Sequence, residues 1–452
     1  MNAVYALLWK AARPFLRRHK RLADGFAERL VPPGWPFTPE MQARPSFGLK
    51  SACRIWIQAA SGGEAYVCAE LLKQLAQGGN PHVLCTACTL QGLEVLRKTQ
   101  EELNGKNITI TVNYLPLDDP GLMDRAVEQA FGPAGVASGN RVMVLLETEI
   151  WPGLLAACRR AGVKTLFINA RMTGKSLRAY KLLAPLLRMA APQGALATSR
   201  EDLQRFCRVF DGPAGAEPGW CRGVMPNIKF DRVYNDAQRG AGCPDMRGNG
   251  LPGLIALGSV REEEERLLLR IIPQLMRFPL VIAPRHLHRV AAWAEALRQR
   301  GLDFVRRSAS ADLEELPRKP GRIVLWDVFG ELDRVYAMAD AAFVGGSLAP
   351  LGGQNFLEPL ACGVSPCIGP YWSNFYWAGR ELFDLGLVTR VRNESELGRA
   401  LLRTAENPRP APEIKLAFRQ YLSPHLGGAK QAAELIFKEY TAGRQGGNNR
   451  YT

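Results

Sequence analysis

A run of four residues, Ser61 to Glu64, could hold an anion and also supply a carboxylate. It lies between an expected strand over Ile55–Ala60 and an expected helix over Ala65–Ala76. Its two glycines let the backbone approach a ligand closely, and N–H groups at the start of a helix favour an anion. Glu64 could act as a general base or could offset the helix dipole. The motif alone favours the dipole role.

Further polar motifs follow expected strands in the first half of the chain. Glu147 and Glu149 come directly after the apolar run Val142–Leu146, where packing does not explain two acids. Ligand contact and helix N-terminal charge account for them equally well. The motif containing Arg171 ends the next expected strand, over Thr165–Asn169, and its guanidinium could bind an anion through two parallel hydrogen bonds.

The second half carries a cationic cluster after the expected strand Leu280–Ala283. The cluster contains Arg285, His286, His288 and Arg289. Two histidines at this spacing, without a nearby cysteine or acid, make a poor metal site. Binding of a phosphate or a carboxylate is the better interpretation.

Glycine pairs at the end of another expected strand, Ala341–Val344, indicate a nucleotide. One pair precedes Ser347, and a second begins the stretch Gly352–Pro359. Glycines between a strand and a helix suit nucleotide phosphates. Asn355 and Glu358 are three residues apart and therefore share a helix face, where the carboxylate could accept both hydroxyls of a ribose.

The elements that position these motifs alternate between short apolar runs and helix-sized segments. This alternation predicts βαβ units and parallel sheets. It is interrupted near residue 220, so we expect two doubly wound α/β domains over 49–220 and 221–442, with a segment 1–48 before them and a disordered tail over 443–452. Because such sheets bind ligands at the carboxyl ends of their strands, the motifs lie where a site is expected.

The composition of the chain limits the classes of molecule that it could bind. The chain has 452 residues, with 58 Lys and Arg against 43 Asp and Glu, which gives a net charge of +15. The excess implies an anionic partner: nucleic acid, anionic lipid or an acidic substrate. Nucleic acid is disfavoured because no basic stripe interleaved with aromatic residues is present. Ten cysteines, about 2% of the residues, indicate reduced thiols in the cytosol.

The first 30 residues carry seven Lys and Arg against two acids, a net +5. Apolar residues precede the charges, which is the reverse of a signal peptide, and no apolar run reaches the ~18 residues of a membrane-spanning helix. The pattern favours a helix lying on an anionic membrane. A surface helix packed on the body, or a solvated basic arm, is the alternative.

Taken together in chain order, the motifs resemble the Kdo (3-deoxy-D-manno-octulosonic acid) transferases of lipopolysaccharide synthesis. The resemblance runs from about Ile55 to Gly428. It passes through Ser61–Glu64, Glu147–Pro152, Asn169–Arg171, Asn227–Asp231, Pro284–His286, Phe343–Leu348, Gly352–Pro359, Gly369–Pro370 and Asn374–Phe375.

The resemblance implies a GT-B glycosyltransferase, in which two Rossmann-like domains face each other across a cleft. It further implies CMP-Kdo as donor, a lipid A precursor as acceptor, inversion at the anomeric carbon, no metal or other cofactor, and a peripheral location on the cytoplasmic face of the inner membrane. The domain over 49–220 would bind the acceptor and the domain over 221–442 the donor.

The resemblance also implies residue roles. Glu64 matches the general base. The acceptor side would include Ser61, Gly62, Gly63, Glu149 and Arg171. The donor would contact Asn227, Lys229, Arg285, His286, Gly345, Gly346, Ser347, Gly353, Gln354, Asn355 and Glu358.

The chain departs from the family pattern mainly on the donor side. Val260 and Arg261 stand in a stretch where the family usually has a histidine, and Gln354 replaces another. Leu287 and His288 differ from the usual Arg-His-Pro-Glu-Arg pattern, and Pro226 replaces a glycine. A related GT-B transferase or epimerase using another nucleotide sugar, and a non-catalytic lipid-binding member, are the alternatives.

Overall fold

The computed structural model forms two compact α/β units. It describes residues 5, 7, 9, 11, 12, 15–17, 24–30, 55–132, 141–148, 150–211, 219–240, 253–309 and 319–441. Unit 1 comprises Met1–Arg232 and His425–Thr452, and unit 2 comprises Val233–Pro424. The predicted tail at 443–452, most of the predicted segment 1–48, and Glu149 lie outside the described residues.

The sheet of unit 1 has seven parallel strands in the order β3-β2-β1-β4-β5-β6-β7. They are β1 (Ile55–Ala59), β2 (His82–Ala87), β3 (Thr109–Tyr114), β4 (Val142–Leu146), β5 (Lys164–Ala170), β6 (Gly194–Ala197) and β7 (Cys221–Val224). The chain moves outward from β1 to β3 and then returns to the other side of β1 with β4. Ligands of such sheets bind at the carboxyl ends of the strand pair where the order reverses.

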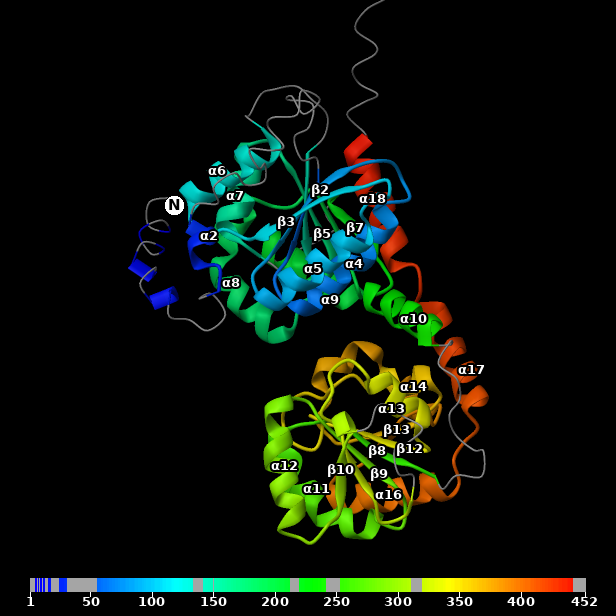
Figure 1. Ribbon diagram of the computed structural model, residues 1–452. Coiled ribbons are helices and arrows are strands. Elements are labelled where there is room, and N and C mark those ends of the chain that lie inside the picture. Colours follow the sequence, from blue (N-terminus) through cyan, green and yellow to red (C-terminus); the bar gives the residue numbers. More distant parts are fainter. Residues whose placement is uncertain are drawn as a thin grey trace, which may run out of the picture. The chain divides into compact units, whose positions relative to one another are not determined.

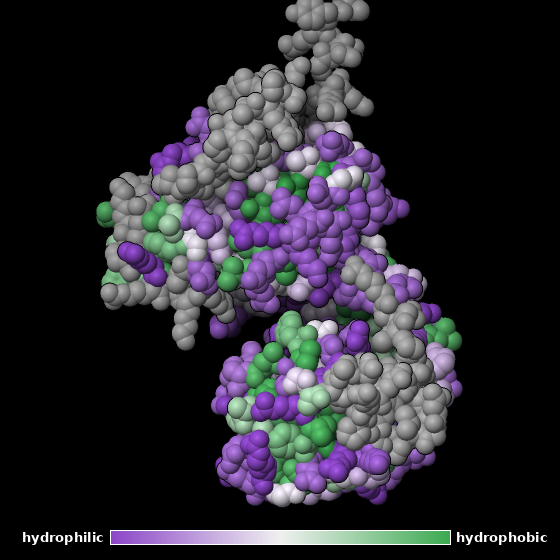
Figure 2. All heavy atoms as spheres, viewed as in Figure 1, coloured by the Kyte–Doolittle hydropathy of each residue, from purple (hydrophilic) through white to green (hydrophobic). Residues whose placement is uncertain are grey.

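Helices cover both faces of this sheet (Figure 1). On one face lie α4 (Gly62–Leu75), α5 (Leu90–Glu102) and α18 (Gly428–Thr441), and on the other α6 (Pro120–Phe131), α7 (Pro152–Arg160), α8 (Gly174–Arg188) and α9 (Arg200–Phe210). Because both faces of the sheet are covered, the central strands β1 and β4 are buried along their whole length. The outward surface of α4 and α5 is largely hydrophilic (Figure 2).

The sheet of unit 2 is also parallel, in the order β10-β11-β9-β8-β12-β13-β14. Its strands are β8 (Ile255–Val260), β9 (Leu280–Pro284), β10 (Phe304–Arg306), β11 (Ile323–Leu325), β12 (Ala341–Val344), β13 (Pro366–Ile368) and β14 (Thr389–Arg390). Its helices are α11 (Glu262–Leu275), η3 (Leu287–Arg289), α12 (Val290–Arg298), η4 (Arg307–Ala309), α13 (Leu332–Met338), α14 (Leu357–Cys362), η5 (Ser373–Ala378), α15 (Glu381–Asp384), α16 (Glu394–Glu406) and α17 (Ala411–Leu422), and η6 (Ser423–His425) follows. Here the strand order reverses between β8 and β12.

The boundary between the units differs from the prediction. The sequence placed it at residue 220 and extended the second domain to 442. In the structure, α10 (Ile228–Gly240) begins in unit 1 and continues into unit 2. The C-terminal α18 belongs to unit 1 because Ala432 and Ile436 pack into the core beside β4 and β5. The carboxylate of Asp231 accepts hydrogen bonds from the N–H groups of Gly427 and Ala429, which fixes the start of α18.

Among the described residues near the N-terminus, Arg29 and Tyr5 contact the rest of unit 1. Arg29, in α2 (Phe26–Leu30), is 1% exposed, donates to the carbonyl of Cys88 at 2.7 Å, and stacks on the ring of Tyr114. It is therefore a structural anchor, which corrects its inclusion in a membrane-facing basic stretch. The hydroxyl of Tyr5 donates to Asp118 at 2.7 Å. No helix in the described ranges is long and apolar enough to cross a bilayer.

Asp118 gives the stability a distinct pH dependence. It accepts hydrogen bonds from the N–H groups of Gly153 and Leu154 at the start of α7, yet burial raises its pKa to about 6. A carboxyl group with a raised pKa in the folded state favours the protonated form, so its contribution to stability is lost as pH rises from about 4 to 6. Over that range, the unfolding free energy of the wild type should fall relative to Asp118→Asn by on the order of 3 kcal/mol. Urea unfolding at several pH values measures this difference, and parallel pH curves would contradict it.

Candidate active site

Glu64 lies where β1 ends, in the first turn of α4. Its Oε2 accepts a hydrogen bond from the N–H of Ser61 at 3.0 Å, so it caps its own helix, as the motif alone favoured. Gly62 is buried, and a Cβ there would lie 2.9 Å from the side chain of Gln91. This glycine therefore lets α4 pack closely against α5, and its contact with an acceptor stays a prediction. Gly63 is exposed.

Glu147 lies directly after β4, the neighbour of β1, and is buried. Its Oε1 is 2.6 Å from the ammonium of Lys229, and its Oε2 is 3.7 Å from the guanidinium of Arg171. Its φ of 56° is in the left-handed region, as is the φ of 55° at Asn169. Non-glycine residues adopt this conformation at a cost, and such strain is concentrated at functional sites.

Asn169, at the end of β5, joins the strand ends to the start of α10. Its Nδ2 donates to Glu147 Oε1 at 3.4 Å and to Asn227 Oδ1 at 3.2 Å. Its Oδ1 accepts from the N–H of Ile228 at 3.0 Å. Asn227 and Lys229, which the sequence grouped with the donor site of the second domain, are thus held in unit 1 beside Glu147.

The electrostatics of this cluster suit a base. The pKa of Glu64 is raised, first by burial and then by the negative charge of Glu147. Lys229 and the backbone N–H groups of Ser61 and Glu64 oppose this rise. A carboxylate with a raised pKa accepts a proton more readily, and it is ionised only at pH values above that pKa.

Glu147→Gln should move the acid limb of the pH–rate profile to lower pH. The base must be ionised to act, so activity falls as pH drops through the raised pKa of Glu64. Removing the charge of Glu147 lowers that pKa. The measurement is kcat/KM against pH, with Glu439→Gln as control, because Glu439 is a buried acid of unit 1 that pairs instead with Lys164 and Arg222. An unmoved acid limb would contradict the coupling.

Asn169 had no assigned role in the sequence analysis, which left Glu147 open between ligand contact and helix N-terminal charge. Both residues stand in motifs that the sequence analysis singled out. Their position at the ends of adjacent strands is the feature that could have shown that they lie together. Arg171 lies beside Glu147, a contact that the sequence did not predict. Its place on the acceptor side stays a prediction.

Unit 2 contains a cavity of about 760 Å³ at the carboxyl ends of β8 and β9. Its lining includes the predicted residues Arg285, Gln354, Asn355 and Glu358. It also includes the apolar side chains Leu287, Trp326, Val328 and Phe329, which the prediction did not name. Asn355 Nδ2 donates to Glu358 Oε1 at 2.9 Å, so the two side chains do meet, although Asn355 precedes α14 and does not lie on its face. Such a volume and mixed lining are typical of small-molecule sites.

The cationic cluster after β9 is not uniform. His286 is exposed with its ring stacked on that of His288, and its pKa is lowered, first by desolvation and then by the charges of Arg261 and Arg285. Arg289 forms ion pairs with Glu265 at 2.6 Å and Glu262 at 3.1 Å. Arg285 is therefore the arginine of this cluster that lines the cavity.

The glycine-rich loop after β12 is bound by an internal carboxylate. The N–H groups of Gly346, Ser347 and Leu348 donate to Glu264 at 2.6, 2.9 and 2.8 Å. Glu264, from the first turn of α11, is fully buried. The N–H groups of Gly346 and Ser347 therefore already have an acceptor, and the contact of Gly345, Gly346 and Ser347 with the donor stays a prediction.

The glycine-rich loop after β12 also supports Gln354, which lines the cavity of unit 2. The N–H groups of Gly353 and Gln354 donate to the carbonyls of Gly346 and Gly345. Gly346 and Gly353 have φ values of 71° and 81°, which only glycine adopts without strain.

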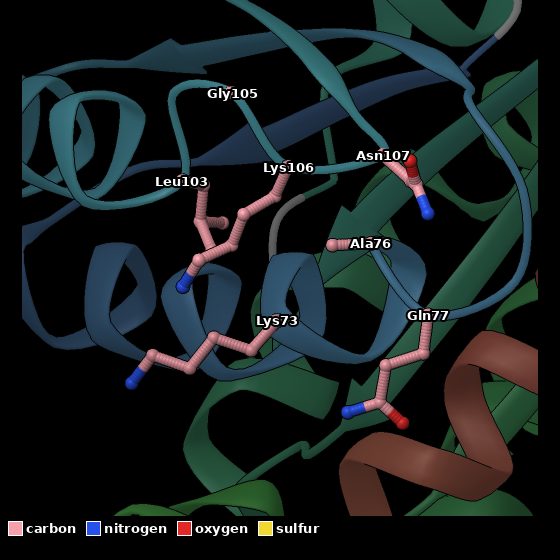
Figure 3. Close-up of a pocket in the computed structure, with 7 residues that line it drawn as sticks. All are labelled: Lys73, Ala76, Gln77, Leu103, Gly105, Lys106 and Asn107. Atoms are coloured by element: carbon pink, nitrogen blue, oxygen red, sulfur yellow. The ribbon is translucent and has the colours of Figure 1, made fainter.

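A second cavity, of about 570 Å³, lies in unit 1 near the last turn of α4 (Figure 3). Its lining includes Lys73, Gln77 and Lys106. Glu64 is in the first turn of the same 14-residue helix, so this cavity is at the opposite edge of the sheet. In the described part of the chain, no three His, Cys, Asp or Glu side chains gather closely enough to hold a metal ion.

Two parallel, doubly wound α/β units, with polar clusters at the carboxyl ends of their strands, define the GT-B fold. A crystal structure of a glycosyltransferase from Rickettsia africae has this fold, with a TM-score of 0.53 and 12% sequence identity over 86% of this chain and 99% of that one.

Sequence comparisons give the family. The model of the 3-deoxy-D-manno-octulosonic-acid transferase (Kdo transferase) family matches residues 25–232. The chain is 33% identical to the 3-deoxy-D-manno-octulosonic acid transferase of Bordetella pertussis, over 85% of this chain and 87% of that protein. It is 27% identical to that of Haemophilus influenzae, over 84% and 86%. The chain belongs to the Kdo transferase family and is a glycosyltransferase that transfers Kdo.

Proposed function

We propose that this enzyme transfers Kdo from CMP-Kdo to a lipid A precursor, with inversion at the anomeric carbon. The observation that carries the proposal is the half-buried Glu64, with its raised pKa, at the point where the strand order of unit 1 reverses. Family membership supports the identity of the transferred sugar.

In the proposed reaction, a hydroxyl oxygen of the acceptor attacks the anomeric carbon of Kdo while Glu64 takes the hydroxyl proton. The bond between that carbon and the phosphate oxygen breaks, and CMP leaves with the electron pair. A single displacement of this kind inverts the anomeric carbon. Glu147 and Lys229 set the proton affinity of Glu64, and Arg171 provides a positive charge near the acceptor.

On the donor side, we place the CMP group in the cavity of unit 2. Glu358 would accept the ribose hydroxyls, held in place by its hydrogen bond from Asn355. Arg285 would stabilise the charge that develops on the departing phosphate, so that the protein and not a metal ion provides this stabilisation.

Arg285→Ala should lower kcat/KM for CMP-Kdo by about 10- to 100-fold, because a hydrogen bond to a charged group contributes on the order of 1.5–3 kcal/mol. The measurement is initial rate against CMP-Kdo concentration. Arg298→Ala is the control, since Arg298 lies on α12 of the same unit and pairs with Glu295. Equal losses in both variants would contradict a donor contact.

The direct test of the proposal is incubation with CMP-Kdo and a lipid A precursor in detergent, followed by mass spectrometry and determination of the anomeric configuration. A Kdo-bearing lipid with inverted configuration is the expected product. Absence of product at high enzyme concentration, with product from another nucleotide sugar, would overturn the proposed donor.

We further propose a peripheral location at the cytoplasmic face of the inner membrane, reached through the N-terminal segment. Leu7 and Phe15 are 68% and 79% exposed, and apolar residues reach the surface in this region (Figure 2). Deleting residues 1–22 should reduce co-sedimentation with liposomes that contain phosphatidylglycerol. Unchanged co-sedimentation would refute this role.

A further inference from the structure

A large share of the net charge lies in a stretch that the proposed function does not explain. Residues 150–199 contain eight Lys and Arg and no Asp or Glu, whereas the whole chain has a net charge of +15. Some of these cations have structural partners. Arg160 pairs with Asp124, Lys164 with Glu439, and Arg171 with Glu147. The cations of α8 do not follow this pattern.

The inner side of α8 is firmly packed and connected to the candidate site. Leu177, Ala184 and Leu187 are buried against the core of unit 1. The hydroxyl of Tyr180 donates to the carbonyl of Thr148 at 3.2 Å, the residue after Glu147. The helix begins three residues after Arg171, with Thr173 as its N-cap.

The outer side of α8 combines cations with exposed apolar side chains. We call this the α8 face, and it consists of Lys175, Arg178, Lys181, Leu182, Leu183, Arg188 and Met189. Leu182 is 85% exposed, Met189 57% and Leu183 44%. Within the described ranges, no acidic side chain lies within ion-pairing distance of its four cations. A soluble surface seldom leaves such a leucine in water beside only positive charges.

We propose that the α8 face is a docking surface for a bilayer containing anionic phospholipids, in contact with it at the edge of the acceptor site. The apolar side chains would enter the headgroup region, while the cations remain at phosphate level, as in interfacial amphipathic helices. This inference deepens the proposed function, because it places the membrane beside Glu147 and Arg171, where a lipid acceptor would enter.

The composition of the face favours a membrane over a macromolecular partner. Protein interfaces are enriched in aromatic side chains and depleted of lysine, whereas the α8 face has two lysines and no aromatic residue. Nucleic acid offers no apolar surface that would favour three exposed apolar side chains without an aromatic ring to stack on the bases. A fluid surface of anionic headgroups over hydrocarbon complements both components at once.

The test uses the full chain and vesicles of phosphatidylcholine with or without phosphatidylglycerol. Leu182→Glu, and the double variant Arg178→Glu with Lys181→Glu, should each lower the partition coefficient on anionic vesicles by about tenfold or more. The loss in the double variant should shrink at high salt, where charges are screened. The controls are Leu416→Glu, a similarly exposed leucine of α17, and Lys430→Glu, an exposed lysine of α18.

The variants should keep the wild-type midpoint of thermal unfolding and the wild-type rate of transfer in neutral detergent micelles, since the substituted side chains are exposed. A lack of transfer by the wild type would refute the proposed function without changing the vesicle result. If the variants of the α8 face bind anionic vesicles as well as the wild type does, the proposal that this face docks on the membrane is wrong. A change of oligomeric state with unchanged vesicle binding would also refute it, and would indicate a second copy of the chain as the occupant.

Discussion

Glu64→Gln is expected to reduce kcat for Kdo transfer by about 10²- to 10⁴-fold, the usual contribution of a positioned general base. Glutamine keeps the length of the side chain and can still accept a hydrogen bond from the N–H of Ser61, so the start of α4 should remain intact. It cannot take a proton from the acceptor hydroxyl. The affinity for CMP-Kdo, measured by calorimetry, should change little, because the donor cavity is in unit 2.

The matched control for this substitution is Glu70→Gln. Glu70 lies on the same helix, is buried, and pairs with Lys73 at 2.6 Å, away from the strand ends. It should retain most activity. Retention of most activity by Glu64→Gln would remove Glu64 as the base, whatever the control shows.

The second large effect is expected from Glu264→Ala, which should lower both the free energy of unfolding and the affinity for the donor. Its buried carboxylate accepts hydrogen bonds from four N–H groups, those of Arg261, Gly346, Ser347 and Leu348. Glu264→Ala would leave these donors buried without an acceptor, at a cost of about 3–5 kcal/mol in the free energy of unfolding. Because the loop supports Gln354, the affinity for CMP-Kdo should also fall.

Glu263→Ala is the control for Glu264→Ala, since Glu263 is the exposed neighbour in the same helical turn. Urea unfolding of the full chain measures the loss, and calorimetry measures donor affinity. A cost below ~1 kcal/mol would mean that the loop holds its conformation without the carboxylate.

The alternation of apolar runs and helix-sized segments was sufficient to predict two parallel α/β units, because strands buried on both faces leave a continuous apolar signal. The motifs also fell at strand ends, where such sheets bind ligands. That is why Glu64, Glu147 and Arg171 could be singled out before their contacts were known.

Long-range packing could not be predicted in the same way. The apolar stripe of α18 does not show which sheet it covers, so its return to unit 1 was missed. In the run of four acids that begins α11, nothing distinguishes Glu264, which points inward, from its neighbours. Arg29 lies in a basic stretch, yet only the fold shows that carbonyl groups and the ring of Tyr114 bury it.

The central claim is that Glu64 activates a lipid acceptor for inverting transfer of Kdo. The most direct measurement compares wild type and Glu64→Gln with CMP-Kdo and a lipid A precursor in detergent, with product quantified by mass spectrometry and its anomeric configuration determined by NMR. The account predicts an inverted Kdo-lipid product from the wild type and at most about 1% of that rate from the variant. A product with retained configuration, or equal rates in the two proteins, would contradict it.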